Sequence, residues 1–401
     1  MNWMLTDMDA YFASVEQSLR PELRGRPVGV IPVETESTCV IAASYDAKRL
    51  GVKVGTGVRE ARRLCPGIVL VKARPKIYVQ VHQRILQTVD KCAEVERVYS
   101  IDEWTVRLRG EQQRPEQAQR LAQDIKREIL KDFGPWMTCS IGIAPTRLLA
   151  KIASNLQKPD GLTVLPVDDL PSRLESLSLK DLCGISHGML ARLDQHGIRN
   201  IRELWEVSRE QAVSIWGSVL GAQWWAGFHG HDEPEVPTRR RSMSHGNVLD
   251  PRFRNEEGAR GILVRLVCKL AQRLRRSGYL AKSLRIAVKD VRGGRFSTEI
   301  DLPAVDDTPT LLQQFYKLWQ RRPSGGYPIK KVDVCVGGLV LASQVSRPLF
   351  SEVEKLQRVS HTLDKINERW GSSSVYFGPM HHYRQPMENK IAFGRIPDEV
   401  D

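Results

Sequence analysis

The sequence feature that most constrains this chain is a pair of adjacent carboxylates, Asp102 and Glu103, at the tip of a predicted β-hairpin. Two short apolar runs, Glu94–Tyr99 and Trp104–Leu108, flank a tight polar turn, a pattern typical of two antiparallel strands. Adjacent carboxylates repel each other unless a cation holds both, and hard cations such as Mg²⁺ prefer oxygen ligands. The hairpin tip is therefore a candidate metal site.

A third carboxylate stands near the start of the chain. The apolar run Trp3–Leu5 predicts a short strand that leads directly into Asp7-Met8-Asp9. If this strand lies beside the hairpin, Asp7 converges with the two hairpin carboxylates, and such a set is typical of two-metal phosphoryl transfer. Each motif alone is weak evidence, because Asp-x-Asp after a strand is more often a cap or turn and Asp-Glu is more often a solvated corner.

The composition indicates a folded protein of several domains with a polyanionic partner. A chain of 401 residues is too long for one typical core and predicts about two to four domains. Its net charge of +13 is typical of a nucleic-acid-binding protein, although a merely basic soluble protein is the alternative. We find neither an apolar run long enough to span a membrane nor a signal pattern at the N-terminus. We therefore expect a cytoplasmic protein without a membrane partner.

The seven cysteines are scattered and include no Cys-x-x-Cys pair. An odd number at irregular spacing indicates neither a disulfide framework nor a zinc site. Most of them stand in apolar runs, where a free cysteine packs as a small core residue.

Up to residue 165, predicted strands alternate with predicted helices. The further strands are Pro27–Pro32, Cys39–Ala43, Ile68–Val71 and Met137–Ala144, and the helices are Ile77–Val89, Pro115–Phe133 and Thr146–Leu156. This alternation predicts a mixed α/β core with a ferredoxin-like central sheet.

Several residues in this part are candidate nucleotide contacts. Tyr11 and Phe12 open a helix just after the first carboxylates, where they either wall a nucleotide pocket or pack in the core. The helix that carries Tyr45 and Lys48 begins at Ser44, a good N-cap residue, and a helix start with nearby cations suits a triphosphate. Solvated surface charge is the alternative. Lys158 either reaches a phosphate or simply favours the C-terminus of its helix.

Taken together, six motifs resemble those of the Y-family DNA polymerases, the DinB/UmuC group that copies damaged templates. They are Asp7-Met8-Asp9-Ala10-Tyr11-Phe12-Ala13-Ser14-Val15-Glu16, Ser44-Tyr45-x-Ala47-Lys48-x-x-Gly51-Val52, Ser100-Ile101-Asp102-Glu103, Ser140-Ile141-Gly142-Ile143, Ala150-Lys151-Ile152-Ala153 and Lys158-Pro159-x-Gly161. Their order is the order of the family, and the resemblance runs over nearly all of the chain.

The resemblance implies a role for each matching residue. Asp7, Asp102 and Glu103 would hold two Mg²⁺ ions with help from the Met8 carbonyl. Phe12 would be the steric gate that packs where a ribose 2′-hydroxyl would sit. The implied triphosphate contacts are Tyr11, Tyr45, Lys48 and Lys158.

Three residues depart from the family pattern. Lys48 stands where most members carry Arg, which keeps the charge but loses bidentate geometry. Trp104 replaces a small residue, and Arg107 replaces an acidic one. These changes put catalytic efficiency in question, and not the reaction class.

The implied fold is α/β (α+β), a right-hand polymerase with a ferredoxin-like palm, small fingers, a helical thumb and a C-terminal βαββαβ little finger. The expected boundaries are palm 1–18 and 72–165, fingers 19–71, thumb 166–230, linker 231–241, little finger 242–350, and a C-terminal helix and tail 351–401. Trp205, Trp216, Trp224 and Trp225 are expected to be core anchors of the thumb.

The thumb and the little finger carry the expected DNA contacts. Leu179–Ile198 predicts two short helices, similar to a helix-hairpin-helix that offers backbone N–H groups to phosphates at Gly184, Ser186 and Gly188. An αα-hairpin without a DNA role is the alternative.

The little finger is predicted from a β-α-β-β-α-β order. Its elements are Ser242–Leu249, Glu256–Arg276, Ser283–Val291, Arg295–Leu302, Thr310–Gln320 and Lys331–Ala342. The first helix would bury Ile262, Leu266, Leu270 and Leu274. Its basic face of Arg265, Lys269 and Arg273, together with Arg239, Arg240 and Arg241, is expected to contact the DNA backbone, with a solvated charged face as the alternative.

Gln344 and the pair Leu349-Phe350 resemble a peptide that docks on a sliding clamp, although a loop that tucks into its own domain explains them as well. The tail after Phe377 carries no recognisable chemistry.

The sequence thus predicts a monomeric DNA-directed DNA polymerase of the translesion type, acting in DNA damage tolerance. Its expected partners are primer–template DNA, dNTPs and a sliding clamp. Two alternatives remain open. One is a catalytically weak family member that serves a repair complex as a DNA-binding adaptor. The other is a nucleotidyl cyclase, which shares the palm and the paired carboxylates.

Overall fold

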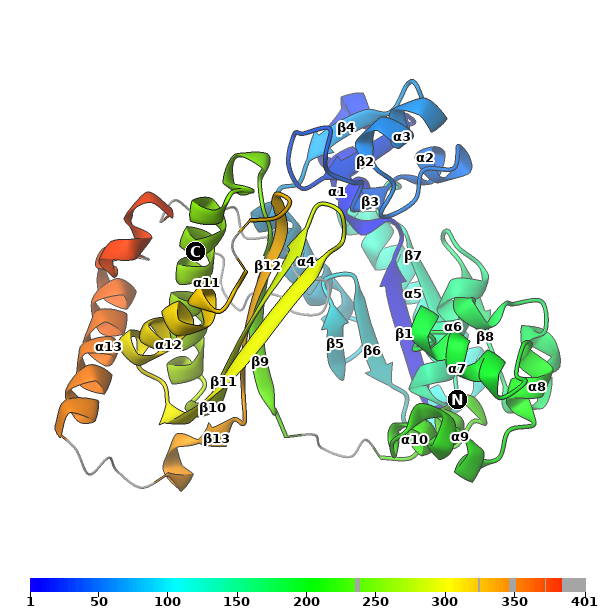
Figure 1. The fold of residues 1–401 in the computed structure, drawn as a ribbon. Coiled ribbons are helices and arrows are strands. Elements are labelled where there is room, and N and C mark those ends of the chain that lie inside the picture. The colour runs from blue at the N-terminus through cyan, green and yellow to red at the C-terminus, as the bar shows by residue number, and fades with distance from the viewer. Residues whose placement is uncertain (235–238, 324, 346–350, 372, 384–401) are drawn as a thin grey trace. The chain divides into compact units, whose positions relative to one another are not determined.

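The computed structural model describes residues 1–234, 239–323, 325–345, 351–371 and 373–383 (Figure 1). The chain forms two compact units, which divide between residues 235 and 236. Within the described part of the chain, no helix combines the length and the apolar character that crossing a membrane requires.

The first unit is built on a five-stranded sheet in the order β5-β6-β1-β7-β8. Its strands are β1 (Trp3–Met8), β5 (Arg97–Ser100), β6 (Glu103–Arg107), β7 (Cys139–Ala144) and β8 (Leu162–Val164). The central strand β1 is antiparallel to both β6 and β7, whereas β7 and β8 are parallel. The predicted hairpin is confirmed by the pairing of β5 with β6, and its second strand lies beside β1 as expected.

Helices cover both faces of this sheet. Residues alternate between the two faces along each strand, so each strand contributes apolar side chains to both cores. On one face, Met4 and Trp104 share a core cluster with residues of α4 (Pro75–Asp90) and α5 (Pro115–Phe133). On the other face, Leu5 packs with Leu149 and Ile152 of α6 (Arg147–Leu156). The side chain of Asp7, two residues after Leu5, belongs to the α6 face.

A smaller sheet in the order β3-β2-β4 belongs to the same unit. Its strands are β2 (Val28–Ile31), β3 (Ala42–Ala43) and β4 (Val69–Lys72), and its helices are α1 (Tyr11–Leu19), η1 (Pro21–Leu23), α2 (Tyr45–Arg49) and α3 (Val58–Leu64). The predicted strand Cys39–Ala43 is shorter than expected, since Cys39 makes only a single bridge, to Gly57. The predicted N-cap is confirmed, because Ser44 Oγ accepts from the backbone N–H groups of Ala47 and Val28.

Between residues 166 and 228 the regular elements are all helices or 3₁₀ turns. Its elements are η3 (Val167–Asp169), η4 (Ser172–Leu174), η5 (Leu179–Asp181), α7 (His187–Gln195), α8 (Ile201–Trp205), α9 (Arg209–Trp216) and α10 (Leu220–Phe228). The prediction of two short helices within Leu179–Ile198 was half right, because the first is a single 3₁₀ turn. Leu182 is extended and Gly184 has a φ of 90°, so the chain cannot continue the turn as a helix. The four tryptophans pack against the core here, as expected.

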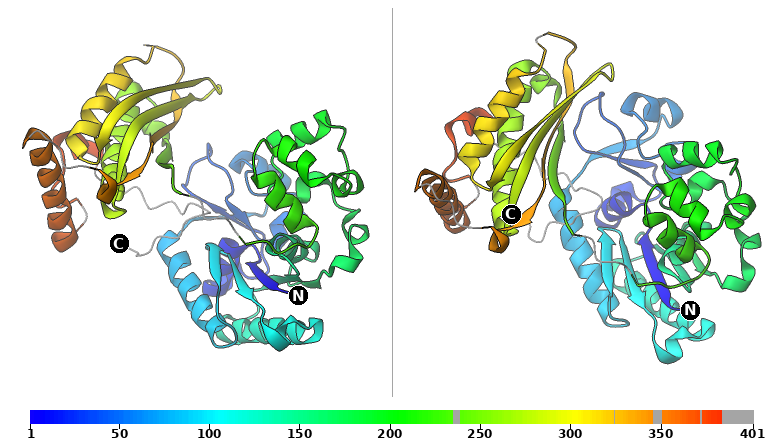
Figure 2. Two further views of the ribbon diagram at one scale, coloured as in Figure 1. Left: turned by 90° about the horizontal axis from the view of Figure 1, so that it is seen from below. Right: turned by 60° about the horizontal axis from the view of Figure 1, so that its bottom comes forward.

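The second unit has the predicted β-α-β-β-α-β order. It consists of β9 (Ser242–Val248), η6 (Pro251–Phe253), α11 (Glu256–Arg276), β10 (Tyr279–Asp290), β11 (Arg295–Val305), α12 (Thr308–Gln320) and β12 (Ile329–Gly337). The sheet has the order β11-β10-β12-β9, and α11 and α12 lie on one face of it (Figure 2). The four predicted core residues of α11 are all buried.

The last predicted strand, Lys331–Ala342, is interrupted. After β12 the chain turns at Gly338, whose φ is 58°, and a separate strand β13 (Val340–Leu341) pairs with the first two residues of β10. The short turn η7 (Ala342–Gln344) follows. Leu349 and Phe350 lie outside the described residues, so the clamp motif stays a prediction.

The segment 351–383 also packs on the second unit. It contains α13 (Ser351–Trp370) and η8 (Gly378–Tyr383). A buried ion pair between Arg275 of α11 and Asp364 of α13, with an Nε–Oδ2 distance of 2.6 Å, attaches the helix. Met380 of η8 is buried in the core of the unit.

Candidate active site

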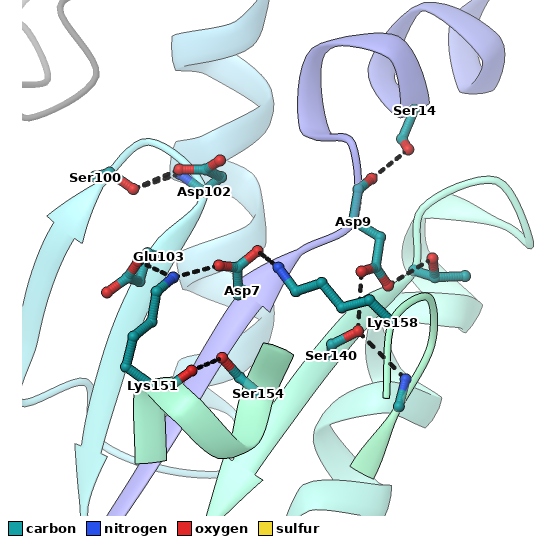
Figure 3. Close-up of polar contacts among 12 residues, drawn as sticks. Asp7, Asp9, Ser14, Ser100, Asp102, Glu103, Ser140, Lys151, Ser154 and Lys158 are labelled. Atoms are coloured by element: carbon teal, nitrogen blue, oxygen red, sulfur yellow. Dashed lines mark hydrogen bonds and ion pairs between the residues drawn. The ribbon is translucent and has the colours of Figure 1, made fainter. Parts of the chain in front are cut away.

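Two of the three predicted carboxylates face each other directly. Asp7 of β1 and Glu103 of β6 are register partners. Both side chains lie on the face of the sheet that α6 covers, as Figure 3 shows. Directly opposed residues of an antiparallel pair are close enough to interact strongly, and like charges in this position are destabilising. The pair therefore needs a compensating charge.

Two lysines supply that charge. Lys151 of α6 forms ion pairs with both Asp7 and Glu103, and Lys158 forms one with the other oxygen of Asp7 (Figure 3). Burial opposes the charge on Lys151, but the two carboxylates outweigh it and raise the pKa of this lysine.

No role was predicted for Lys151, although it lies in one of the six motifs. A signal was available. Its neighbours Leu149, Ala150, Ile152 and Ala153 are all apolar, and a lysine within such a run requires an acidic partner across the core.

Asp102 lies near this pair but its side chain points elsewhere. Its carboxylate accepts from the Ser100 hydroxyl, and its backbone carbonyl accepts from Met8 N–H at 2.8 Å. Burial raises the pKa of Asp102, the bond from Ser100 lowers it, and the charge of Asp7 raises it further. The net effect disfavours the ionised carboxylate until a cation compensates it.

The donor set fits divalent cations in its chemistry. The chain brings together three carboxylates and the Met8 carbonyl, which are the oxygen ligands that Mg²⁺ prefers. Among the residues that the structure describes, no three His, Cys, Asp or Glu side chains are already arranged around one point as metal ligands. Asp102 has to turn away from Ser100, and Lys151 from its two carboxylates, before all three can share a cation.

Asp9, two residues after Asp7, is fully buried and is the centre of a hydrogen-bond network. Its carboxylate accepts from Tyr45 Oη at 3.3 Å, Ser140 Oγ at 2.9 Å, Thr138 Oγ1 at 3.0 Å and Asp160 N at 2.8 Å. No role was predicted for it, because its partners come from separate segments far along the chain.

Three of the predicted triphosphate contacts adjoin these carboxylates. The Lys48 ammonium lies 4.1 Å from the centre of the Tyr45 ring. Burial, and next the positive charge of Lys158, lower the pKa of Lys48. Burial and the charge of Asp9 raise the pKa of Tyr45, which therefore keeps its proton. Two mutually repelling cations beside a neutral hydroxyl favour an anionic ligand.

Tyr11 and Phe12 lie in the core of the first unit. They are only 3% and 4% exposed. The Tyr11 hydroxyl donates to the Tyr78 carbonyl at 2.7 Å, and the Phe12 ring stacks on the Tyr78 ring with centroids 4.5 Å apart. Core packing is thus part of what both residues do, and a contact with nucleotide remains a prediction.

Comparison with known proteins decides the family. The model of the impB/mucB/samB family matches residues 6–155, and the model of the C-terminal domain of that family matches residues 240–349. A DNA polymerase IV of Moorella thermoacetica is 33% identical over 93% of this chain and 94% of its own length. The chain belongs to the Y-family of DNA polymerases.

Further relatives agree with this assignment. A DNA polymerase IV of Pelotomaculum thermopropionicum is 29% identical over 93% of this chain and 93% of its own length. A solved Y-family DNA polymerase chimera has a TM-score of 0.69, at 22% identity, over 85% of this chain and 100% of its own. The right-hand polymerase fold with a little-finger domain is therefore confirmed.

Two of the three departures from the Y-family pattern, Trp104 and Arg107, lie away from the carboxylates, whereas Lys48 adjoins them. The Trp104 side chain is fully buried on the opposite face of the sheet from Glu103. Arg107 pairs with Trp3 at the far end of β1 and β6, where it forms an ion pair with Asp232. Neither side chain takes part in the contacts of the carboxylates described above, and the effect of the two changes on catalytic efficiency stays a prediction.

The predicted DNA contacts differ in their exposure to solvent. Ser186 is the N-cap of α7, with Gly184 and Gly188 on either side of it. This position does not test the helix-hairpin-helix interpretation. Arg239, Arg240, Arg241 and Lys269 are exposed.

On α11, two of the predicted contacts are less accessible. Arg273 is half-buried and donates to the Ser244 carbonyl at 3.4 Å. Arg265 is only 5% exposed, although it lies on the predicted basic face of the helix. Its burial does not support a contact with the phosphate backbone, and that contact stays a prediction.

The raised pKa of Asp102 predicts that this residue destabilises the metal-free protein. The folded state binds a proton at Asp102 more readily than the unfolded state does, so its cost to stability appears as the pH rises through that pKa. We expect Asp102→Asn to unfold at a higher urea concentration than the parent near neutral pH. The difference should shrink toward the acid range in which the carboxyl is protonated in both states.

The measurement is urea denaturation across that pH range in the presence of a chelator. Asp132→Asn is the matched control with the opposite sign, because the hydrogen bond from Lys91 lowers the pKa of Asp132. A lower midpoint for Asp102→Asn at neutral pH would contradict the prediction.

Proposed function

We propose that this chain is a translesion DNA polymerase that extends a primer 3′-end with dNTPs at Asp7, Asp102 and Glu103. The observation that carries the proposal is the register of Asp7 against Glu103, with Lys48 and Lys158 beside them. Carboxylates for cations and cations for a triphosphate then lie side by side. Relatives named DNA polymerase IV, similar over nearly their whole length, support the same reaction.

Some residues of the site would bind metal ions and phosphates, and one would restrict the space beside the sugar. The three carboxylates and the Met8 carbonyl would hold two Mg²⁺ ions, which when bound activate the 3′-hydroxyl and neutralise charge on the phosphates. Lys48 and Lys158 would bind phosphate oxygens as point charges, and Tyr45 would donate its hydroxyl. Phe12, fixed by its stack on Tyr78, would close the space beside the sugar.

The two alternatives are less well supported. An adaptor without activity has no need for the Asp7–Glu103 pair, whose mutual repulsion costs stability and is offset by Lys151. A nucleotidyl cyclase has no need for the second unit, which the C-terminal model of the Y-family matches. The proposed contacts at the thumb and with a sliding clamp rest on the sequence alone.

The carboxylates provide the direct test. We expect Asp7→Asn, Asp102→Asn and Glu103→Gln each to reduce primer extension by about 10²–10³-fold or more, the scale on which loss of one charge-stabilising group lowers kcat. Binding of primer–template DNA should remain, because these residues are not part of a basic surface. Asp124→Asn is the control, since Asp124 forms an exposed ion pair on α5. Near-parental extension by any of the three variants would exclude that residue from the site.

Sugar selection tests the position of the nucleotide. We expect Phe12→Ala to incorporate ribonucleotides far more readily than the parent, because the ring no longer excludes the 2′-hydroxyl. Steric exclusion can exceed the discrimination that one added group gives in a roomy pocket, about 1–3 kcal/mol.

Single-nucleotide extension with dNTP and rNTP on the same primer measures the effect. Tyr11→Ala is the comparison, and it should weaken the use of both nucleotide types equally. If Phe12→Ala keeps the parental sugar preference, the residue only packs in the core and the pocket is misplaced.

DNA binding by the second unit is tested by salt. We expect replacement of Arg239, Arg240 and Arg241 by Ala to reduce the slope of log affinity against log salt by about 0.9 for each phosphate that these arginines neutralise. Equilibrium binding of primer–template DNA at several salt concentrations gives the slope. Arg127→Ala, an exposed residue of α5, is the control. An unchanged slope in the triple variant would mean that these arginines do not contact phosphates.

A further inference from the structure

Lys126, on α5, joins three parts of the first unit. Its ammonium group donates to the carbonyls of Cys139 at 2.9 Å, Asp160 at 2.7 Å and Gly161 at 3.3 Å, and to the Asp160 carboxylate at 2.6 Å. An ammonium group has three protons, so these four acceptors occupy it fully. Lys126 therefore attaches the loop after α6 to β7 and to its own helix.

Asp9 holds the same loop through a different group of Asp160. Its carboxylate accepts from the backbone N–H of Asp160, whose carbonyl and carboxylate are bonded to Lys126. Asp160 has a φ of 57°, in the left-handed region that costs a non-glycine residue free energy and persists only where its surroundings impose it. The two charged contacts supply that constraint.

The loop also allows little freedom at its next residue. A Cβ atom on Gly161 would overlap the carbonyl oxygen of Gln157, so only glycine fits. The backbone between Gln157 and Gly161 is thus held in one compact conformation, and Lys158 projects from it toward Asp7.

Asp9 connects this loop to a second phosphate-binding candidate. The same carboxylate that fixes Asp160 accepts from Tyr45 Oη at 3.3 Å. Lys158 and Tyr45 come from segments more than a hundred residues apart, yet both are positioned through contacts with Asp9.

We propose that Asp9 and Lys126 are positioning residues for nucleotide binding, which fix the loop 157–161 so that Lys158 lies where a phosphate group binds. Asp9 places Tyr45 in the same way. This role rests on the proposed function, in which Lys158 and Tyr45 contact the triphosphate. Neither positioning residue needs to touch the nucleotide itself.

A double-mutant cycle tests the role of Lys126. We expect Lys126→Met to raise KM for dNTP about tenfold or more, the effect of losing one hydrogen bond to a charged group, while kcat changes much less. In a Lys158→Met background the same substitution should change KM less than about twofold, because the loop no longer carries the group that it positions. The measurement is steady-state single-nucleotide extension with each single variant and the double variant.

Two further variants distinguish an effect on nucleotide binding from a general loss of structure. Asp160→Gly removes the carboxylate but suits the left-handed backbone, and it should raise KM in the same way, again only when Lys158 is present. Lys131→Met on the same helix removes an exposed lysine that pairs with Glu128, and it should leave KM unchanged. A merely structural role would lower kcat through a smaller folded fraction and leave KM alone.

The outcomes distinguish the positioning role of Lys126 from the triphosphate contact of Lys158 on which it rests. If Lys126→Met raises KM equally with and without Lys158, the positioning role is overturned and the triphosphate contact stands. If Lys158→Met itself leaves KM unchanged, the triphosphate contact is wrong, and the positioning role falls with it.

Discussion

The site depends on how the repulsion between neighbouring carboxylates is balanced. The register of β1 and β6 forces Asp7 against Glu103, and the sheet itself provides nothing to offset this. The offset comes from α6 and from the loop behind it, through Lys151 and Lys158. Asp102 accepts from the Ser100 hydroxyl and is stabilised by the charge of Lys151, but burial outweighs both and raises its pKa. The charge arrangement thus destabilises the metal-free folded state, and bound divalent cations would stabilise it. Such a loss of stability is common at functional sites.

The central position of β1 makes this arrangement possible. One face of the strand carries Met4 into the core with Trp104, and the other carries Leu5 and Asp7 toward α6. Because side chains alternate between the faces, a bulky Trp104 beside Glu103 fills the core and not the site. The strand then leads into Asp9, whose buried carboxylate joins α2, β7 and the loop after α6. One short segment at the start of the chain therefore connects every part of the first unit that the proposed reaction uses.

Much of the fold could be predicted because its signals are local. The strand–helix alternation, the hairpin, the Ser44 cap and the βαββαβ order of the second unit depend on periodicity and on short-range hydrogen bonds, and the structure has all of them. The errors concern geometry that periodicity leaves open. Leu179–Ile198 keeps one helix because Gly184 turns the chain, and the last strand breaks at Gly338 for the same reason. Arg265 was expected on an exposed basic face but is buried, because the pattern of α11 shows which face is apolar and not what the fold packs against the other face.

The sequence by itself determined the family and the class of reaction and predicted the three carboxylates, because these are carried by residue types at fixed positions within short motifs. Only the tertiary structure decided what surrounds the carboxylates. Lys151 reaches Asp7 across 144 positions of the chain, and Asp160 reaches Asp9 across 151. It also showed that Tyr11 and Phe12 pack against Tyr78. Such contacts exist because a buried charge or hydroxyl must find a partner, and the segment that provides it is chosen by the packing of helices on the sheet, which no local pattern encodes.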